Sequence, residues 1–173
     1  MYRAMLIGML AAAPAMANPG VEEFRAVLSG FNETGALNAE TGAILSQGTG
    51  VVEVKLDRNT QTISFTLKFQ NLSAPVTQAH IHFGKIHVPG GVMVFFCSNL
   101  ATAPAGTQPC PANGGTVTGT LTAANVVAIA GQNVPAGDFS AVADALLSDT
   151  AYVNVHTTNF PAGEIRGQLT RDF

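Results

Sequence analysis

The sequence predicts an all-β protein, an antiparallel β-sandwich of about eight short strands with one short crossover helix. Several segments rich in Val, Thr, Ile and Phe alternate apolar and polar residues at a period of two, and Gly, Asn and Pro separate them. Only one longer segment places apolar residues at helical spacing. With 173 residues, 47% of them hydrophobic and 11% charged, the chain suits one compact domain.

The N-terminal segment has the composition of a secretory signal peptide. Arg3 supplies a positive start, residues 4–13 an apolar stretch, and residues 15–17 (Ala-Met-Ala) a small-x-small cleavage site. We therefore expect a signal peptide over residues 1–17 and a single domain over residues 18–173. The apolar stretch is shorter than the roughly 20 residues of a spanning helix. The mature chain should have no transmembrane segment and should be periplasmic or secreted.

The expected strands follow one another along the mature chain. A hairpin turn at residues 57–59 joins two of them, and period-two alternation after this turn places Ile63, Phe65, Leu67 and Phe69 on one face. The eight strand segments, in order, are EEFRAVLSG, GTGVVEVKLD, TISFTLKFQNL, AHIHFG, GVMVFFC, GGTVTGTLT, AYVNVHT and EIRGQLTR.

Two segments interrupt this alternation, and two others are loops by composition. GDFSAVADALLSD carries Phe139, Val142, Leu146 and Leu147 at helical spacing behind Asp138, a candidate N-cap, and predicts the crossover helix. TAANVVAIAGQ predicts a further short helical turn. The loops are NETGALNAETGA and NLATAPAGTQPCPANGG.

The two cysteines predict a disulfide bond. Cys97 and Cys110 are the only pair in the chain, and an exported protein folds in an oxidising compartment. A loop of this size contributes roughly 3 kcal/mol by the chain-entropy estimate. Metal-ligating or redox-active thiols are the alternative, but the pair lacks CxxC spacing.

Three histidines are candidate metal ligands. His80 and His82 lie two apart in an expected strand, so both imidazoles point to the same face. His156 lies in AYVNVHT and joins them if the two strands are neighbours. Three imidazoles suit Cu(II) or Zn(II), and the affinity order favours copper. His87, in a loop, is a candidate fourth ligand; histidines that hydrogen-bond to backbone carbonyls are the structural alternative.

Glu164 and Arg166 are interpreted as a structural ion pair. They lie two apart in EIRGQLTR, and a half-buried Arg that holds a carboxylate or backbone carbonyls is commoner than a catalytic guanidinium. Gly167, inside the same strand, indicates a close approach of two backbones.

Composition and motifs exclude several functions. A net charge of -3 without any cluster of Lys and Arg argues against a nucleic-acid partner. The chain has no GxSxG, P-loop or HExxH motif, and its acidic residues form no pair at a spacing suited to glycoside hydrolysis. We name no catalytic residue and favour a binding protein over an enzyme.

The motifs AHIHFG, GGVMVFFC, GGTVTGTLT and AYVNVHTTNFPAGEIRGQL, in this order, resemble the CHRD (chordin) domain family from about Phe24 to Leu169. The resemblance is to a single-domain, exported, bacterial-type member and implies an immunoglobulin-like or superoxide-dismutase-like β-sandwich. The cysteine-rich modules that bind growth factors in animal members are absent from this sequence. Lys85, Ile86 and His87 stand where the family usually has small, Gly-rich residues.

Three functions stay open at this point. The first is an exported CHRD-domain protein that coordinates a transition metal, copper rather than zinc, through its histidines. The second is a non-catalytic module that binds an extracellular or envelope protein or a glycan, with structural histidines. The third is a dismutase-like metal redox enzyme, since the His-x-His strand is similar to the copper strand of copper/zinc superoxide dismutase.

Overall fold

The computed structural model describes residues 20–34 and 42–172. The expected signal peptide and the middle of the expected loop NETGALNAETGA lie outside the described residues. The described elements, in chain order, are β1 (Val21–Ser29), η1 (Gly30–Asn32), β2 (Thr49–Asp57), β3 (Thr62–Gln70), β4 (Val76–Phe83), β5 (Gly91–Ser98), β6 (Gly115–Leu121), η2 (Ala123–Asn125), η3 (Ala130–Gln132), α1 (Phe139–Leu147), β7 (Ala151–Thr157), β8 (Ile165–Gln168) and β9 (Thr170–Arg171).

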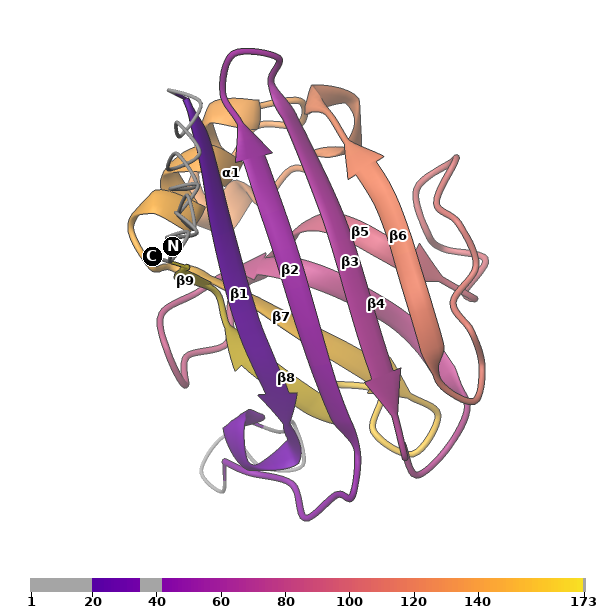
Figure 1. Ribbon diagram of the computed structural model, residues 1–173. Helices are drawn as coiled ribbons and strands as arrows, with labels where there is room; N and C mark the ends of the chain where they lie inside the picture. The colour runs from indigo at the N-terminus through magenta and orange to yellow at the C-terminus, as the bar shows by residue number, and fades with distance from the viewer. Residues whose placement is uncertain (1–19, 35–41, 173) are drawn as a thin grey trace, which may run out of the picture.

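The strands form one antiparallel sheet that folds over into two layers. Its order is β5-β4-β7-β8-β1-β2-β3-β6, with the short β9 paired to β1. In Figure 1, β1, β2, β3 and β6 make the front layer, and β4, β5, β7 and β8 cross behind it. This arrangement confirms the expected all-β sandwich with one helix.

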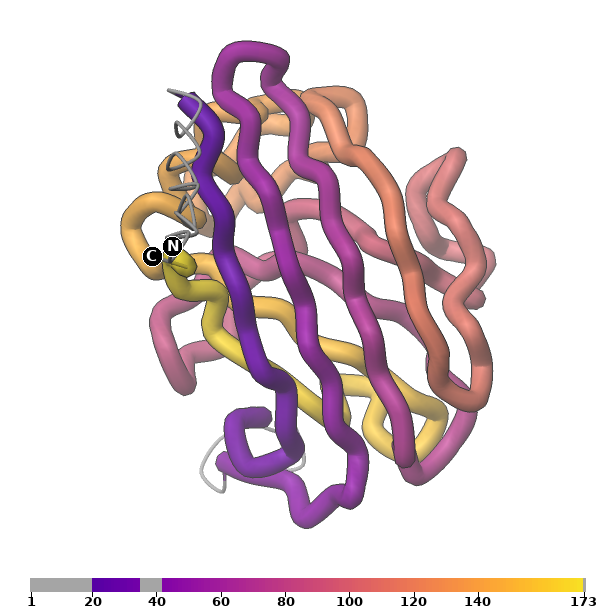
Figure 2. The backbone as a smooth tube through the Cα atoms, viewed as in Figure 1, coloured from indigo at the N-terminus to yellow at the C-terminus, as the bar shows by residue number. Residues whose placement is uncertain are grey.

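The chain passes between the layers three times between β3 and β7. Figure 2 shows it leaving β3 for β4 in the back layer by a short connection, returning from β5 to β6 in the front layer, and passing from β6 through the helical segment to β7. As a result β7 lies directly between β4 and β8 in the sheet. This neighbourhood brings together two strands that are far apart in the sequence.

The core lies between the two layers and follows the alternation of the strands. The four β3 residues expected on one face, Ile63, Phe65, Leu67 and Phe69, are all buried. Phe65 stacks on Phe96 of the back layer with ring centroids 4.2 Å apart. Burial of such side chains contributes about 1.5–3 kcal/mol each and holds the layers together.

The expected helix and disulfide are both confirmed. α1 begins after Asp138, whose side chain accepts a hydrogen bond from the backbone N–H of Ala141, and its apolar face is buried. Cys97 and Cys110 form the disulfide. Within the loop that the disulfide closes, Gln108 Nε2 donates to the carbonyls of Phe96 and Thr118, and so links the edge strands β5 and β6.

Gly167 confirms a close approach of two backbones. A Cβ at this position in β8 would meet the carbonyl oxygen of Val27 in β1 at 2.5 Å. The front and back layers are joined at this contact, because β8 pairs with β1 there.

Candidate metal centre

The outer face of the back layer carries a row of buried polar side chains. Ala79 and Ile81 of β4 and Val153 and Val155 of β7 belong to the core, so the residues between them point the other way. Those outward residues are His80, His82, Tyr152, Asn154 and His156. All five are nevertheless buried.

The register between β4 and β7 decides how these residues meet. His80 lies opposite Asn154, and His82 lies opposite Tyr152. His156 lies one pair further along, opposite Gln78, and is therefore diagonal to His80. Adjacent strands at this register bring all three imidazoles into one cluster.

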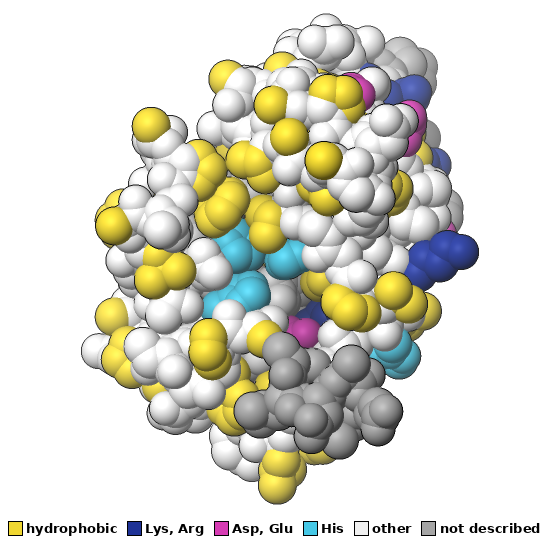
Figure 3. All heavy atoms as spheres, turned by 180° about the vertical axis from the view of Figure 1, so that it is seen from behind, with side chains coloured by type: hydrophobic (Ala, Val, Ile, Leu, Met, Phe, Trp, Pro, Cys, Tyr) yellow, Lys and Arg dark blue, Asp and Glu magenta, His cyan; other side chains and the backbone are white. Residues whose placement is uncertain are grey.

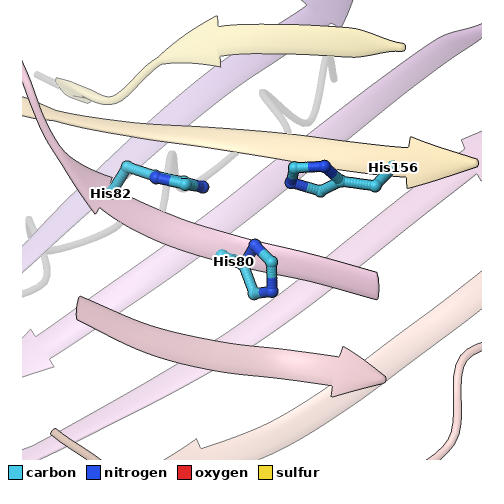
Figure 4. A group of neighbouring side chains, drawn as sticks. All are labelled: His80, His82 and His156. Atoms are coloured by element: carbon cyan, nitrogen blue, oxygen red, sulfur yellow. The ribbon is translucent and has the colours of Figure 1, made fainter. Parts of the chain in front are cut away.

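His80, His82 and His156, called the histidine triad below, point toward one another (Figure 4). Each offers a ring nitrogen such that all three nitrogens lie within 4.8 Å of one another. Nitrogens bound at about 2.0–2.1 Å to one ion lie roughly 3–4 Å apart. Small rotations of the rings would therefore bring the triad into the geometry of a three-imidazole metal site.

Two of the three rings are held by backbone carbonyls. His82 Nδ1 lies 2.9 Å from the Gly90 carbonyl oxygen, and His156 Nδ1 lies 3.0 Å from that of Pro161. Because a carbonyl can only accept, both Nδ1 atoms donate and the Nε2 atoms carry the lone pairs. Metal-ligating histidines commonly have this arrangement, which fixes the tautomer and the direction of the ring.

The remaining nitrogens of His80 and His82 lack hydrogen-bond partners. Among the described residues, neither ring nitrogen of His80 has a hydrogen-bond partner, and Nε2 of His82 has none either. His80 is 1% exposed, His82 7% and His156 5%. An unpaired buried polar group costs about 1–3 kcal/mol, and a metal ion bound by these lone pairs would remove that cost.

Burial lowers the pKa of each member of the triad. It lowers the pKa of His80 to about 2, with smaller effects from His156 and His82. It also lowers the pKa of His156 to about 4, although the hydrogen bond to Pro161 acts in the opposite direction. Burial lowers the pKa of His82 too, although its interactions with the Gly90 carbonyl and with the Asn154 side chain act in the opposite direction. All three imidazoles are therefore neutral at pH 7 and able to bind a metal ion.

Asn154 connects the triad to a buried carboxyl group. Its Oδ1 lies 2.9 Å from His156 Nε2, and its Nδ2 donates to Glu33 at 3.4 Å. The amide group of Asn154 therefore lies between the imidazole of His156 and the carboxyl group of Glu33. Burial raises the pKa of Glu33, which lies 3% exposed beside Asn154.

An aromatic and cationic stack supports the other side of the triad. The rings of His82 and Tyr152 are stacked with centroids 4.7 Å apart, and the Arg166 guanidinium carbon lies 3.3 Å from the Tyr152 centroid. The Tyr152 hydroxyl accepts from the backbone N–H of Gly90. Gly90, whose carbonyl group orients His82, is therefore itself held by Tyr152, the residue on which His82 stacks.

Gly90 and Gly163 permit the loops around the triad to approach closely. A Cβ at Gly90 would collide with the carbonyl oxygen of Phe83, so only glycine lets this loop return toward His82. Gly163 has φ +131° and a Cβ there would collide with the Glu33 carboxyl group.

Seen from the side of the back layer, histidine side chains lie at the floor of a hollow (Figure 3).

His87 lies apart from the triad. It is exposed, adopts φ 59° in the loop between β4 and β5, and does not belong to the group of converging ligand atoms. The expected cluster of three is thus brought together, whereas the candidate fourth ligand is not part of it.

Glu164 and Arg166 do not form the expected ion pair with each other. Glu164 precedes the first residue of β8, so strand alternation does not place it on the same face as Arg166. Its carboxylate accepts hydrogen bonds from Ser46, Ser73 and Thr157. Arg166 instead donates to the backbone carbonyls at positions 85 and 88, and so anchors the loop that carries Gly90.

Sequence reasoning missed the groups that orient the triad. Glu33 lies at the start of an expected loop, and no local pattern connects it with Asn154, more than a hundred residues away. The carbonyls of Gly90 and Pro161 carry no sequence signal, because any residue supplies a carbonyl. The sequence indicates only, through its turn residues, where the chain could reverse direction.

The fold and the site define a class of protein, a β-sandwich with a buried three-histidine group on the outer face of one layer that could hold a metal ion. The chain belongs to the CHRD domain family, which it matches over residues 24–169, nearly its whole length. This confirms the resemblance expected from the sequence motifs. No curated protein and no solved structure matches the chain.

A helix that spans a membrane must be long and apolar. None of the helices in ranges 20–34 and 42–172 has the length and apolar character needed to cross a bilayer.

Proposed function

We propose that this CHRD-domain protein is exported and coordinates a transition metal ion, copper rather than zinc, through His80, His82 and His156. The observation that carries the proposal is the convergence of three buried neutral imidazoles, two of which have ring nitrogens without partners. A purely structural histidine would use those nitrogens in hydrogen bonds. His82 and His156 instead donate through their Nδ1 atoms to backbone carbonyls, an arrangement that is common in metal sites.

The preference for copper follows from the donor set. Imidazole is a ligand for both copper and zinc, and the order of divalent affinities places copper above zinc at sites of nitrogen donors. No cysteine competes, because both cysteines of the chain are joined in the disulfide. The disulfide also fits the oxidising compartment that the N-terminal sequence pattern predicts.

Binding is favoured over catalysis because no group that moves protons is among the ligand atoms of the triad. Its three side chains are almost fully buried, and no carboxylate belongs to the group of converging ligand atoms in the described ranges. Metal enzymes keep an open coordination position and a group that moves protons beside it. The site is therefore best suited to holding an ion, as in storage, delivery or structural stabilisation.

A titration tests the proposal. The chain from Asn18 onward, purified without a polyhistidine tag and stripped with a chelator, is titrated with Cu(II) and with Zn(II) by calorimetry. This chain retains every described residue. We expect micromolar or tighter binding of one ion per chain, with copper tighter, and loss of this binding in the double variant His80→Ala/His82→Ala.

The control is His87→Ala, which removes an exposed histidine outside the triad. It should bind as the unmodified chain does. Equal binding by the double variant and the unmodified chain would mean that the triad is not the site and would contradict the proposal.

A further inference from the structure

We propose that the ion for which this site is built is monovalent copper, Cu(I), which it holds in preference to Cu(II) and Zn(II). The inference rests on the proposed function and adds the charge of the cargo. Three features carry it: the neutral ligand set, the burial of the site and the charges that surround it.

The ligand set brings no negative charge. The group of ligand atoms consists of three imidazoles and, among the described residues, no carboxylate or thiolate. The oxygen that lies 2.9 Å from His156 Nε2, Asn154 Oδ1, belongs to an amide and is neutral too. A bound ion would therefore keep its whole charge inside the protein.

Burial makes that charge decisive. The three histidines are between 1% and 7% exposed, so a bound ion is removed from most of its water. The Born cost of such a transfer grows with the square of the charge, and is about fourfold greater for a divalent than for a monovalent ion. Three neutral ligands are also a sufficient set for Cu(I), whereas divalent ions prefer four or more.

The surrounding charges act in the same direction. Arg166 is buried, with its guanidinium carbon 3.3 Å from the centroid of the Tyr152 ring on which His82 stacks. This fixed positive charge repels a divalent ion more strongly than a monovalent one. Glu33 is the acidic group linked to the triad through Asn154; burial raises its pKa, although the charge of Arg166 acts in the opposite direction.

The experiment measures both oxidation states on one protein. The chain from Asn18 is titrated with Cu(I) under anaerobic conditions against a chromophoric Cu(I) chelator, and with Cu(II) and Zn(II) against chelators of those ions. We expect Cu(I) to be held at least about 100-fold more tightly than Cu(II). At 59 mV per decade, this ratio raises the Cu(II)/Cu(I) reduction potential of the bound ion by about 120 mV relative to the free ion.

Phe95 offers a matched pair of variants that tests the electrostatic reason. It is half-buried, lies opposite His80 in β5 and contacts the His80 ring edge-on at 4.3 Å between centroids. Phe95→Asp adds a carboxylate beside the site, and Phe95→Asn adds a neutral group of the same size. The Asp variant should lower the ratio of Cu(I) to Cu(II) affinity about tenfold relative to the Asn variant.

The outcomes separate the two proposals. Cu(II) or Zn(II) bound as tightly as Cu(I), with both lost in His80→Ala/His82→Ala, overturns the preference for Cu(I) and leaves the metal-binding function standing. An unchanged ratio between the Asp and Asn variants also overturns it. Failure of the unmodified chain to bind any of the three ions overturns both.

Discussion

The ring of His82 lies parallel to the ring of Tyr152, with an angle of 5° between the ring planes and 4.7 Å between the centroids. The two residues face each other across β4 and β7, and Gly90 contacts both, through its carbonyl on His82 and its N–H on Tyr152. The aromatic ring, the loop and the candidate ligand therefore form one packed unit.

Tyr152 should report metal binding by its fluorescence. The chain has no Trp and two Tyr, and a chain that begins at Asn18 keeps only Tyr152. Because the ring stacks on His82, a paramagnetic Cu(II) ion at the triad should quench most of the tyrosine emission, whereas Zn(II) should leave most of it. The measurement is emission during titration, with His87→Ala as the matched control. Quenching that persists in His80→Ala/His82→Ala would place the ion elsewhere.

His80→Leu should stabilise the metal-free protein while it abolishes tight metal binding. Both ring nitrogens of His80 are buried without partners, and an apolar side chain of similar size removes this penalty of about 1–3 kcal/mol. We expect a gain of about 1 kcal/mol in the free energy of unfolding, which raises the melting temperature by roughly 2–4 °C for a domain of this size.

The control for this variant is His87→Leu at the exposed position, which should leave both stability and affinity nearly unchanged. Chemical denaturation of the metal-free proteins gives the comparison. A His80→Leu protein that is markedly less stable would mean that His80 contributes to the metal-free fold, contrary to the account of its nitrogens.

The metal-free protein should lose stability as the pH falls from about 6.5 toward 4. The pKa of His80 is lowered to about 2 and that of His156 to about 4, and that of His82 is lowered as well. The unfolded chain therefore takes up protons near pH 6.5 that the folded chain refuses. Each such proton removes about 1.4 kcal/mol per pH unit. The stabilisation is complete above the unfolded pKa and declines below it.

Glu33 opposes this trend, because its raised pKa favours proton uptake by the folded state. Urea denaturation between about pH 7.5 and about pH 5 measures the net slope. His80→Leu removes one of the refused protons and should show a shallower decline. Equal slopes for the two proteins would argue that His80 titrates normally in the folded state.

Removal of the disulfide should lower stability without removing the metal site. Cys97 belongs to the core, whereas the histidines of the triad lie on the opposite face of the back layer. We expect Cys97→Ala/Cys110→Ala to lose roughly 3 kcal/mol in the free energy of unfolding. The affinity of the folded variant for copper should change only a few fold. A complete loss of binding by a folded variant would contradict this separation of the two sites.

Alternation within single strands was sufficient to predict much of the fold. It placed His80 with His82 and His156 with Asn154, and it identified the core face of β3. The pairing of β4 with β7 was left open, because adjacency of strands separated by a long connection depends on the whole topology. The triad exists only because the register sets His156 diagonal to His80.

Alternation failed where a residue lies just outside a strand. Glu164 belongs to the bend before β8, and so it contacts Ser46 and Ser73 instead of Arg166. Arg166 found backbone carbonyls of a loop whose path no local pattern describes. Strand boundaries and loop paths are thus the features that the sequence left undetermined near the site.

Anomalous diffraction from crystals of the copper-loaded chain tests the central claim most directly. We predict one copper peak at about 2.0–2.1 Å from Nε2 of His82, Nε2 of His156 and one ring nitrogen of His80, with the Nδ1 contacts to Gly90 and Pro161 kept. A copper ion bound at His87 or elsewhere on the surface, with the triad free of metal, would contradict the account.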